Sequence, residues 1–301
     1  MSAAITRASL LRGAFAERIA PAYASDPTVV ALILGGSVAR GHADRFSDLE
    51  LFVVRTEPPT NADRGGAIAA AGGDLVWLHP VEDDVPGPVW CDVWKIGRRG
   101  DQAFTGIEVD MHHVLAKTVE QTLRDVVEEF DADVRKHSFV GGLLHAIPLH
   151  GEAIVESWQK RASTYPDQLR VAVVRAHAQI EGLWRLDAFC ARSNPVAGYT
   201  VLTGAHEELL HALLGLNRVY YSGFKSLEAV AADLLVTPRD LLERVRASYP
   251  LRSGASREIL TGLVEDTHDL IEEHLPEIDI DRLRTILRYE RPLWDAPASD
   301  T

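Results

Sequence analysis

The sequence predicts an α+β fold in which a mixed β-sheet flanked by helices is followed by an all-α helical bundle. In the N-terminal half, strand patterns at residues 29–34 and 48–53 alternate with loops and helical patterns. In the C-terminal half strand patterns disappear, and apolar residues recur at helical spacing. Glycines and a proline within residues 139–152 are typical of a boundary, so we expect domains at 1–140 and 141–301.

Length and composition fit this two-part plan. The chain has 301 residues, of which 46% are hydrophobic and 25% charged, which is typical of a globular protein with two cores. Only two cysteines, Cys91 and Cys190, argue against a disulfide scaffold and suit a reducing compartment. No signal peptide and no apolar run approaching the ~20 residues of a membrane span are visible. We therefore expect a soluble, cytoplasmic protein without a membrane partner.

The net charge restricts the choice of partners. The formal charge is −13 at pH 7. Because nucleic-acid binding normally uses a basic surface that displaces counterions from phosphates, a long nucleic acid is disfavoured as a substrate. An acidic protein fits a cationic small molecule better.

The chain begins with a helix and a buried strand. Residues 5–23 place apolar side chains at helical spacing, and Pro21 together with residues 25–27 should end this helix. Val29–Leu34 is apolar throughout and predicts a strand buried on both faces. A short helix over residues 37–40 should follow, with its first amides positioned to meet an anion.

The next strand carries two carboxylates on one face. Leu49, Leu51 and Val53 alternate with Asp48, Glu50 and Phe52, and this period of two sends both acids to the same side. Two close, partly desolvated carboxylates repel each other unless a cation lies between them, and Mg²⁺ prefers such hard oxygen ligands. A solvent-facing pair on an edge strand is the simpler alternative.

The turn before this strand is suited to phosphate. Gly35 and Gly36 allow the backbone to approach a ligand closely, and the Ser37 hydroxyl and the amides after the turn can donate to phosphate oxygens. A Gly-Gly turn that only joins two strands is the simpler alternative here.

The remaining pattern alternates once more and then becomes helical. Within the first domain we expect helices over 63–71 and 118–136 and strands over 74–78, 89–96 and 107–114. Beyond it we expect helices from Pro166 to a break at residues 193–195, from Tyr199 to Gly223, from Thr237, from Ser256 to Leu275 and from Asp279.

The order and spacing of these signals resemble those of a known superfamily. GGSVARGHADRFSDLEL, with GGS, ten residues and then D-x-E on a strand, resembles the signature of the polymerase-β-type nucleotidyltransferases. It looks particularly like the stand-alone members that include aminoglycoside and lincosamide adenylyltransferases. By this resemblance Gly36 and Ser37 hold the triphosphate, and Arg40 is a further candidate nucleotide contact. Glu50 departs from the superfamily, where aspartate is more usual.

The resemblance also implies a third carboxylate on a neighbouring strand. Asp110, in Val-Asp-Met, matches best, and Glu108 on the same face is the reserve candidate. Asp48, Glu50 and Asp110 would then hold two Mg²⁺ ions, one activating the attacking oxygen and one binding the triphosphate.

A segment of the helical half extends the resemblance more weakly. LNRVYYSGFKSLEAVA is similar to the part of the stand-alone enzymes in which an asparagine and a lysine face the nucleotide, which implies Asn217 and Lys225 here. Lys225, after a glycine, can neutralise triphosphate charge, and a solvated surface lysine is the alternative.

The function predicted is nucleotidyl transfer, with AMP moved from ATP, or another NMP from its NTP, to a hydroxyl of a small cationic acceptor such as an aminoglycoside. Pyrophosphate would be released. A toxin-like transferase acting on tRNA or protein is one alternative, which the acidic charge disfavours. A catalytically silent nucleotide-binding regulator is another, which the intact carboxylates disfavour. Many relatives form homodimers, and the sequence leaves the oligomeric state open.

Overall fold

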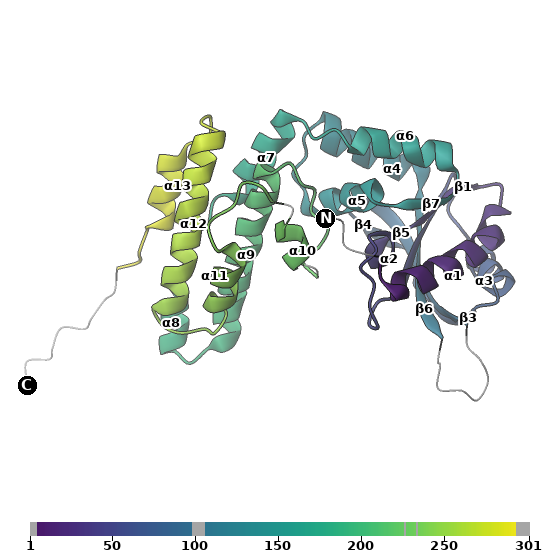
Figure 1. Ribbon diagram of the computed structural model, residues 1–301, viewed down its shortest axis with the longest axis horizontal. Helices are drawn as coiled ribbons and strands as arrows, with labels where there is room; N and C mark the ends of the chain where they lie inside the picture. Colours follow the sequence, from purple (N-terminus) through teal and green to yellow (C-terminus); the bar gives the residue numbers. More distant parts are fainter. Residues whose placement is uncertain (1–4, 98–105, 226, 233, 293–301) are drawn as a thin grey trace, which may run out of the picture. The chain divides into compact units, whose positions relative to one another are not determined.

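The computed structural model describes residues 5–97, 106–225, 227–232 and 234–292 (Figure 1). The chain forms two compact units, Met1–Tyr165 and Pro166–Thr301. The described part of the first unit contains a mixed sheet with helices, and that of the second contains helices only, which confirms the α+β prediction. The division comes later than the expected boundary between residues 140 and 141, which falls inside a helix.

A seven-stranded sheet forms the centre of the first unit. Its order is β3-β5-β6-β2-β1-β7, with β4 also paired to β5. Strands β2 and β6 run parallel, whereas the other described pairs are antiparallel. The strands are β1 (Val29–Leu34), β2 (Leu49–Arg55), β3 (Asp74–Leu78), β4 (Glu82–Asp84), β5 (Gly87–Ile96), β6 (Ile107–Leu115) and β7 (Ile147–His150).

Six α-helices and one π-helix accompany this sheet in the described residues. They are α1 (Arg7–Ala24), α2 (Gly36–Ala39), α3 (Asn61–Ala70), α4 (Ala116–Leu123), the π-helix η1 (Arg124–Glu128), α5 (Val134–Leu144) and α6 (Glu152–Ala162).

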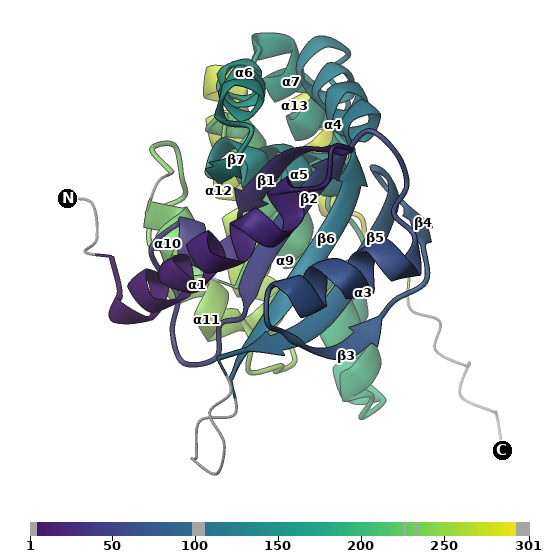
Figure 2. The ribbon, with the colours of Figure 1, turned by 90° about the vertical axis from the view of Figure 1, so that its right-hand side faces the viewer.

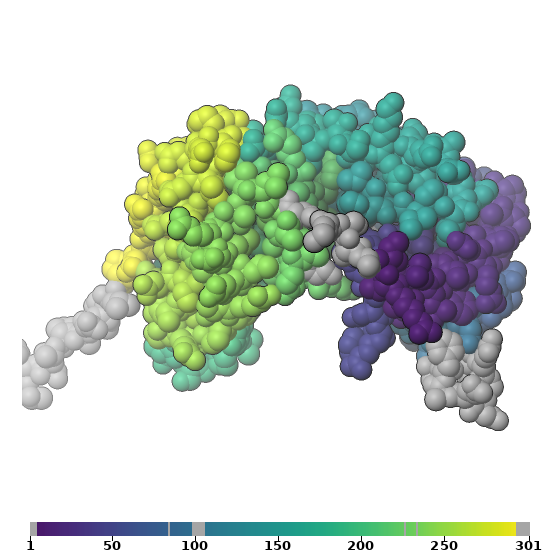
Figure 3. Space-filling view, viewed as in Figure 1, coloured from purple at the N-terminus to yellow at the C-terminus, as the bar shows by residue number. Residues whose placement is uncertain are grey.

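One face of the sheet packs against α1 and α3 (Figure 2). Ile19 of α1 and Ile68 of α3 join Leu51 and Met111 of the central strands in one apolar core. The outer side of α1 lies at the molecular surface (Figure 3), where Leu10 is exposed. Because strand side chains alternate, the residues between the buried ones on β2 and β6 lie on the opposite, polar face.

Helix α1 ends at Ala24, just before residues 25–27 as expected, and the buried Tyr23 packs its last turn into the core. Three details of the first unit differ from the sequence prediction. The single helix expected over 118–136 is divided into α4, η1 and α5, with Phe130 at φ 61° between them. The short strand β4 lies within the loop expected after β3. Strand β7 was not predicted, because only its pairing with β1 identifies so short a segment.

The second unit is built from seven described helices around its own apolar core. They are α7 (Asp167–His177), α8 (Arg185–Ala191), α9 (Pro195–Leu216), α10 (Leu227–Ala232), α11 (Leu241–Ser248), α12 (Ala255–His274) and α13 (Ile280–Leu287). The first helix ends at His177 rather than at the break expected at residues 193–195, and Gly182 at φ 71° begins the turn into a second helix, α8. Helix α9 ends before the expected Gly223, and the helix expected from Thr237 begins only at Leu241.

No helix within the described ranges is long and apolar enough to cross a membrane.

Candidate active site on strands β2 and β6

The turn after β1 lies directly against Glu50. The Gly35 amide donates to the Glu50 carbonyl at 3.0 Å. Gly36 has φ 60°, a left-handed conformation that favours glycine, and a Cβ added there would lie 2.3 Å from Oε2 of Glu50. The backbone conformation therefore favours glycine at position 36, and a side chain there would displace the Glu50 carboxylate, so the turn and the carboxylate form one local structure.

Strand register brings the three predicted carboxylates to one region. Glu50 on β2 is directly opposite Asp110 on the parallel strand β6. Asp48 immediately precedes β2 and alternates with the buried Leu49, so it shares the polar face with Glu50. Burial raises the pKa of the Asp110 carboxyl, and the negative charge of Asp48 raises it further. The carboxylates are thus close enough to repel one another.

Asp110 and Glu108 differ in their surroundings. Asp110 is half-buried opposite Glu50, whereas Glu108 is exposed and lies opposite Lys95 of β5. Among the neighbouring carboxylates, Asp48 raises the pKa of Asp110 most, followed by Glu108 and then Glu50. The register, with Glu50 opposite Asp110, favours Asp110 as the third carboxylate, and Glu108 stays the reserve candidate.

Ser37 and Arg40 both belong to the short helix region after the Gly-Gly turn. Ser37 is half-buried in α2, and its carbonyl accepts a hydrogen bond from the His42 amide at 2.9 Å. Arg40 caps the C-terminal end of α2 and is also half-buried. Gly36, Ser37 and Glu50 are thus adjacent, and Arg40 follows one helical turn later.

An aromatic pair and a thiol extend the polar face beyond the carboxylates. Phe52 and His112 are opposite each other in the register, and their rings stack with centroids 5.0 Å apart. Cys91 of β5 is opposite His112. Burial, with a contribution from Asp110, raises the pKa of the Cys91 thiol to about 11, so it is protonated at neutral pH and a poor nucleophile. Sequence reasoning did not link Cys91 to the carboxylates.

The donor chemistry of the site fits a hard divalent cation. The side chains of Asp48, Glu50 and Asp110 offer oxygen ligands only, and their mutual repulsion is of the kind that a bound cation relieves. As the side chains lie in the described residues, no three His, Cys, Asp or Glu groups converge on a single metal position.

Helix α1 holds the loop that leads to Asp48. The Thr6 hydroxyl donates to the Ala43 carbonyl at 2.6 Å, and the Ala43 amide donates to the Ser9 hydroxyl at 3.0 Å. Arg12 donates from Nε and Nη2 to the Ser47 carbonyl at 2.9 and 2.5 Å. Sequence reasoning missed this contact, although the three-residue spacing of these polar side chains marks one face of the helix.

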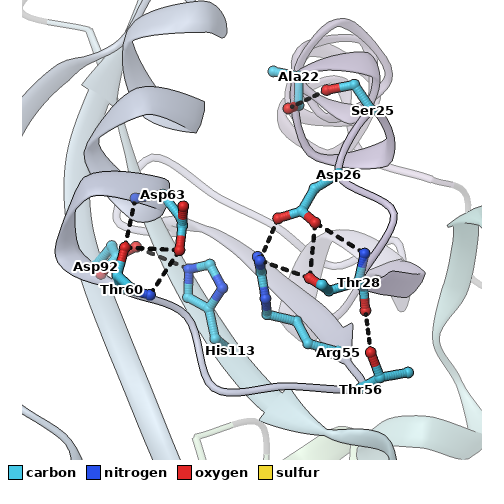
Figure 4. A network of polar contacts seen from close by, with 10 residues as sticks. All are labelled: Ala22, Ser25, Asp26, Thr28, Arg55, Thr56, Thr60, Asp63, Asp92 and His113. Atoms are coloured by element: carbon cyan, nitrogen blue, oxygen red, sulfur yellow. Dashed lines mark hydrogen bonds and ion pairs between the residues drawn. The ribbon is translucent and has the colours of Figure 1, made fainter.

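A buried polar network supports β5 and β6 from the other face of the sheet. Asp92 accepts a hydrogen bond from Arg64 Nε at 2.7 Å. The other carboxylate oxygen of Asp92 lies 2.9 Å from His113 Nε2 (Figure 4). Burial lowers the pKa of His113, and the hydrogen bond to Asp92 opposes this shift. Figure 4 also shows Arg55, at the end of β2, bound to Asp26 and Thr28.

Asn217 is fully engaged within the second unit. Its Nδ2 donates to the carbonyls of Leu213 and Val236, both at 2.8 Å. Its Oδ1 accepts from the amides of Leu235 and Val236 at 2.8 and 2.7 Å. These four bonds use the whole capacity of an amide side chain. Asn217 therefore ties the end of α9 to residues 235–236. A nucleotide could bind to its side-chain amide only if some of these hydrogen bonds were broken.

Lys225 is exposed on the segment between α9 and α10. The preceding Phe224 packs partly against the core of the second unit and contacts Tyr221 edge-on, with centroids 4.9 Å apart. Phe224 is thus a packing residue, as its type suggested. The structure places Asn217 and Lys225 in the second unit, whereas Gly36, Ser37 and the three carboxylates belong to the first.

Comparison with known proteins adds little to this picture. No protein-family model matches the sequence, and no curated protein does. Among solved structures, a nucleotidyltransferase-like protein from Exiguobacterium sibiricum 255-15 is similar at 14% identity. The match covers 92% of this chain and 88% of that chain, with a TM-score of 0.39. A likeness of this size carries no argument about function, which is argued below from the residues of this chain.

Proposed function

We propose that this protein is a metal-dependent nucleotidyltransferase that moves AMP from ATP to a hydroxyl of a small, cationic acceptor such as an aminoglycoside. The observation that supports this most is the contact between the Gly36 turn and Glu50, combined with the register of Glu50 opposite Asp110. A phosphate-binding turn and a group of carboxylates thereby meet at one place.

The reaction would proceed with each group in a separate role. The acceptor oxygen forms a bond to the α-phosphorus, the bond from that phosphorus to the bridging oxygen breaks, and the acceptor hydroxyl loses its proton as pyrophosphate leaves. The Ser37 hydroxyl and the amides after Gly36 donate to triphosphate oxygens. Arg40 adds a positive charge near the same oxygens, and Lys225 is a second candidate for that role.

The carboxylates hold the metal in this proposal. Asp48, Glu50 and Asp110 would hold two Mg²⁺ ions, and the register of Glu50 opposite Asp110 supports this assignment. When bound, Mg²⁺ supplies positive charge beside the transferred phosphoryl group and lowers the pKa of the attacking hydroxyl. The carboxylates also align donor and acceptor, which lowers the entropic part of the barrier.

The acceptor and the location follow from charge and composition. With a net charge of −13 the protein attracts a cation more readily than a nucleic acid. Cys91 and Cys190 are free thiols, in keeping with a cytoplasmic location. A homodimer is compatible with the proposal but is not required by it.

Pyrophosphate release measured against panels of acceptors tests this function. Release from Mg·ATP that requires an added hydroxylated amine supports the proposal, and Asp48→Asn should abolish it. Label from the nucleotide appearing in RNA or protein would instead favour a toxin-like transferase. Nucleotide binding without any release would identify a regulator that has lost turnover.

A further inference from the structure

The loop between the Gly-Gly turn and β2 is fixed to α1 at both ends and in the middle. The Thr6 amide donates to the Gly41 carbonyl at 3.1 Å, and Ala43 is bound by two side chains of α1. The last contact is the double hydrogen bond from Arg12 to the Ser47 carbonyl. Arg12 is itself buried, with 9% of its surface exposed, and Nη1 also reaches the Ala8 carbonyl at 3.4 Å.

The contact with Ser47 bears directly on Asp48. A peptide unit is planar from one Cα to the next, so holding the Ser47 carbonyl oxygen also restrains the Cα of Asp48. Asp48 lies just before β2, whose first paired residue is Leu49, opposite Val109. Arg12 therefore adds a constraint on the peptide unit immediately before the paired part of the strand.

We propose that Arg12 is a positioning residue, which fixes the backbone at Asp48 so that this carboxylate is held beside Asp110. The inference rests on the proposed function, because it assigns to Asp48 the role of metal ligand. Guanidinium suits the task because two of its N–H groups can bind one carbonyl in a fixed plane, whereas a lysine ammonium lacks that planar fork. Groups that orient metal ligands in this way typically contribute about 10–100-fold to metal affinity.

Arg55 provides a matched control for Arg12. It is also buried, and it holds the other end of β2 through Asp26 and Thr28. Replacing either arginine by methionine keeps an unbranched side chain and removes its hydrogen bonds. Both variants should lose stability, but only the change at Arg12 alters the peptide unit that carries Asp48.

The experiment titrates Mn²⁺ into the nucleotide-free full chain and measures free Mn²⁺ by electron paramagnetic resonance. We expect Arg12→Met to weaken Mn²⁺ binding by about tenfold or more, as for other groups that orient metal ligands. Arg12→Lys should restore part of the affinity. Arg55→Met should lower the melting temperature and leave the Mn²⁺ affinity unchanged.

The outcomes separate this inference from the proposed function. Unchanged Mn²⁺ affinity in Arg12→Met, or an equal loss in Arg55→Met, overturns the positioning role while leaving the metal site in place. Mn²⁺ binding that Asp48→Asn does not weaken contradicts the metal site itself, and the role of Arg12 fails with it. If Arg12→Met does not fold, Arg12→Lys takes its place, because it keeps the positive charge and lacks the planar fork. A fall in Mn²⁺ affinity in that variant relative to the wild type supports the inference, and no fall overturns it.

Discussion

Substitution of Gly36 by alanine should separate site function from fold stability. Gly36 has φ 60°, and a Cβ there would lie 2.3 Å from Oε2 and 3.2 Å from Cβ of Glu50. The left-handed conformation alone costs an alanine about 1–2 kcal/mol, which lowers the melting temperature of a unit of this size by about 2–8 °C. The contact with Oε2 must in addition be relieved, and the carboxylate, as the free end of a flexible side chain, is the part that moves. We therefore expect Glu50 to leave its place beside Asp110.

Gly72 is the matched control for this substitution. It also has positive φ, at 71°, and a Cβ added there meets nothing within 4 Å. Both alanine variants should show similar melting temperatures, measured by circular dichroism. Only Gly36→Ala should lose Mn²⁺ affinity and turnover. The expected loss is about tenfold to a hundredfold, because one charge-assisted interaction contributes roughly 1.5–3 kcal/mol. Equal Mn²⁺ affinity in the two variants would refute the reasoning that Gly36 exists to accommodate Glu50.

Three further predictions concern single residues. The fold raises the pKa of Asp110. Ionisation of this carboxyl therefore lowers the free energy of unfolding as pH rises from the unfolded value of 3.8 through the folded pKa. Asp110→Asn should therefore raise the metal-free melting temperature at pH 7, with a smaller difference near pH 4, while abolishing transfer; a lower melting temperature at pH 7 would contradict the repulsion. Burial lowers the pKa of His206 from 6.5, so the unfolded chain takes up a proton below that pH and the folded chain does not. Stability should fall from pH 7 to pH 5, by up to about 1.4 kcal/mol per pH unit for one such group, and less steeply in His206→Gln in chemical denaturation. If Lys225 binds the triphosphate, Lys225→Ala should weaken ATP binding by about tenfold to a hundredfold in a calorimetric titration, with the melting temperature unchanged; unchanged ATP binding would return this lysine to the solvated surface.

Local patterns were sufficient for most of the fold. The apolar run of β1 and the alternation on β2 and β6 predicted strands that the structure contains, because burial on one or both faces determines which residues a strand can carry. Strand β7 was missed, since its four residues include Pro148 and gain their structure from pairing with β1. That pairing joins residues 147–150 to the first unit, and the hydrogen bond from Trp158 Nε1 of α6 to Glu120 of α4 at 2.5 Å joins α6 to it, so the unit extends beyond residue 140.

Local patterns identify the candidate site only where its residues are close in the chain, and Asp110 was reached through the resemblance instead. Gly36, Asp48 and Glu50 lie within one segment, and a strand period of two identifies the shared face of the carboxylates. The contact from Arg12 to Ser47 joins residues that are 35 apart, so no local pattern reveals it. For Asn217 the sequence left two roles open, because an asparagine near a helix end can contact a ligand or hydrogen-bond to the backbone equally well. Only its four hydrogen bonds in the structure identify the backbone role.

Transfer of label from ATP labelled at the α-phosphorus tests the central claim most directly. Wild-type protein and Asp48→Asn are incubated with Mg·ATP and a hydroxylated amine acceptor, and the products are separated by chromatography. The account predicts labelled AMP joined to the acceptor and one pyrophosphate released for each transfer with the wild type, and neither with Asp48→Asn. Release of inorganic phosphate without labelled acceptor, or equal transfer by Asp48→Asn, would contradict the assignment of this site to nucleotidyl transfer.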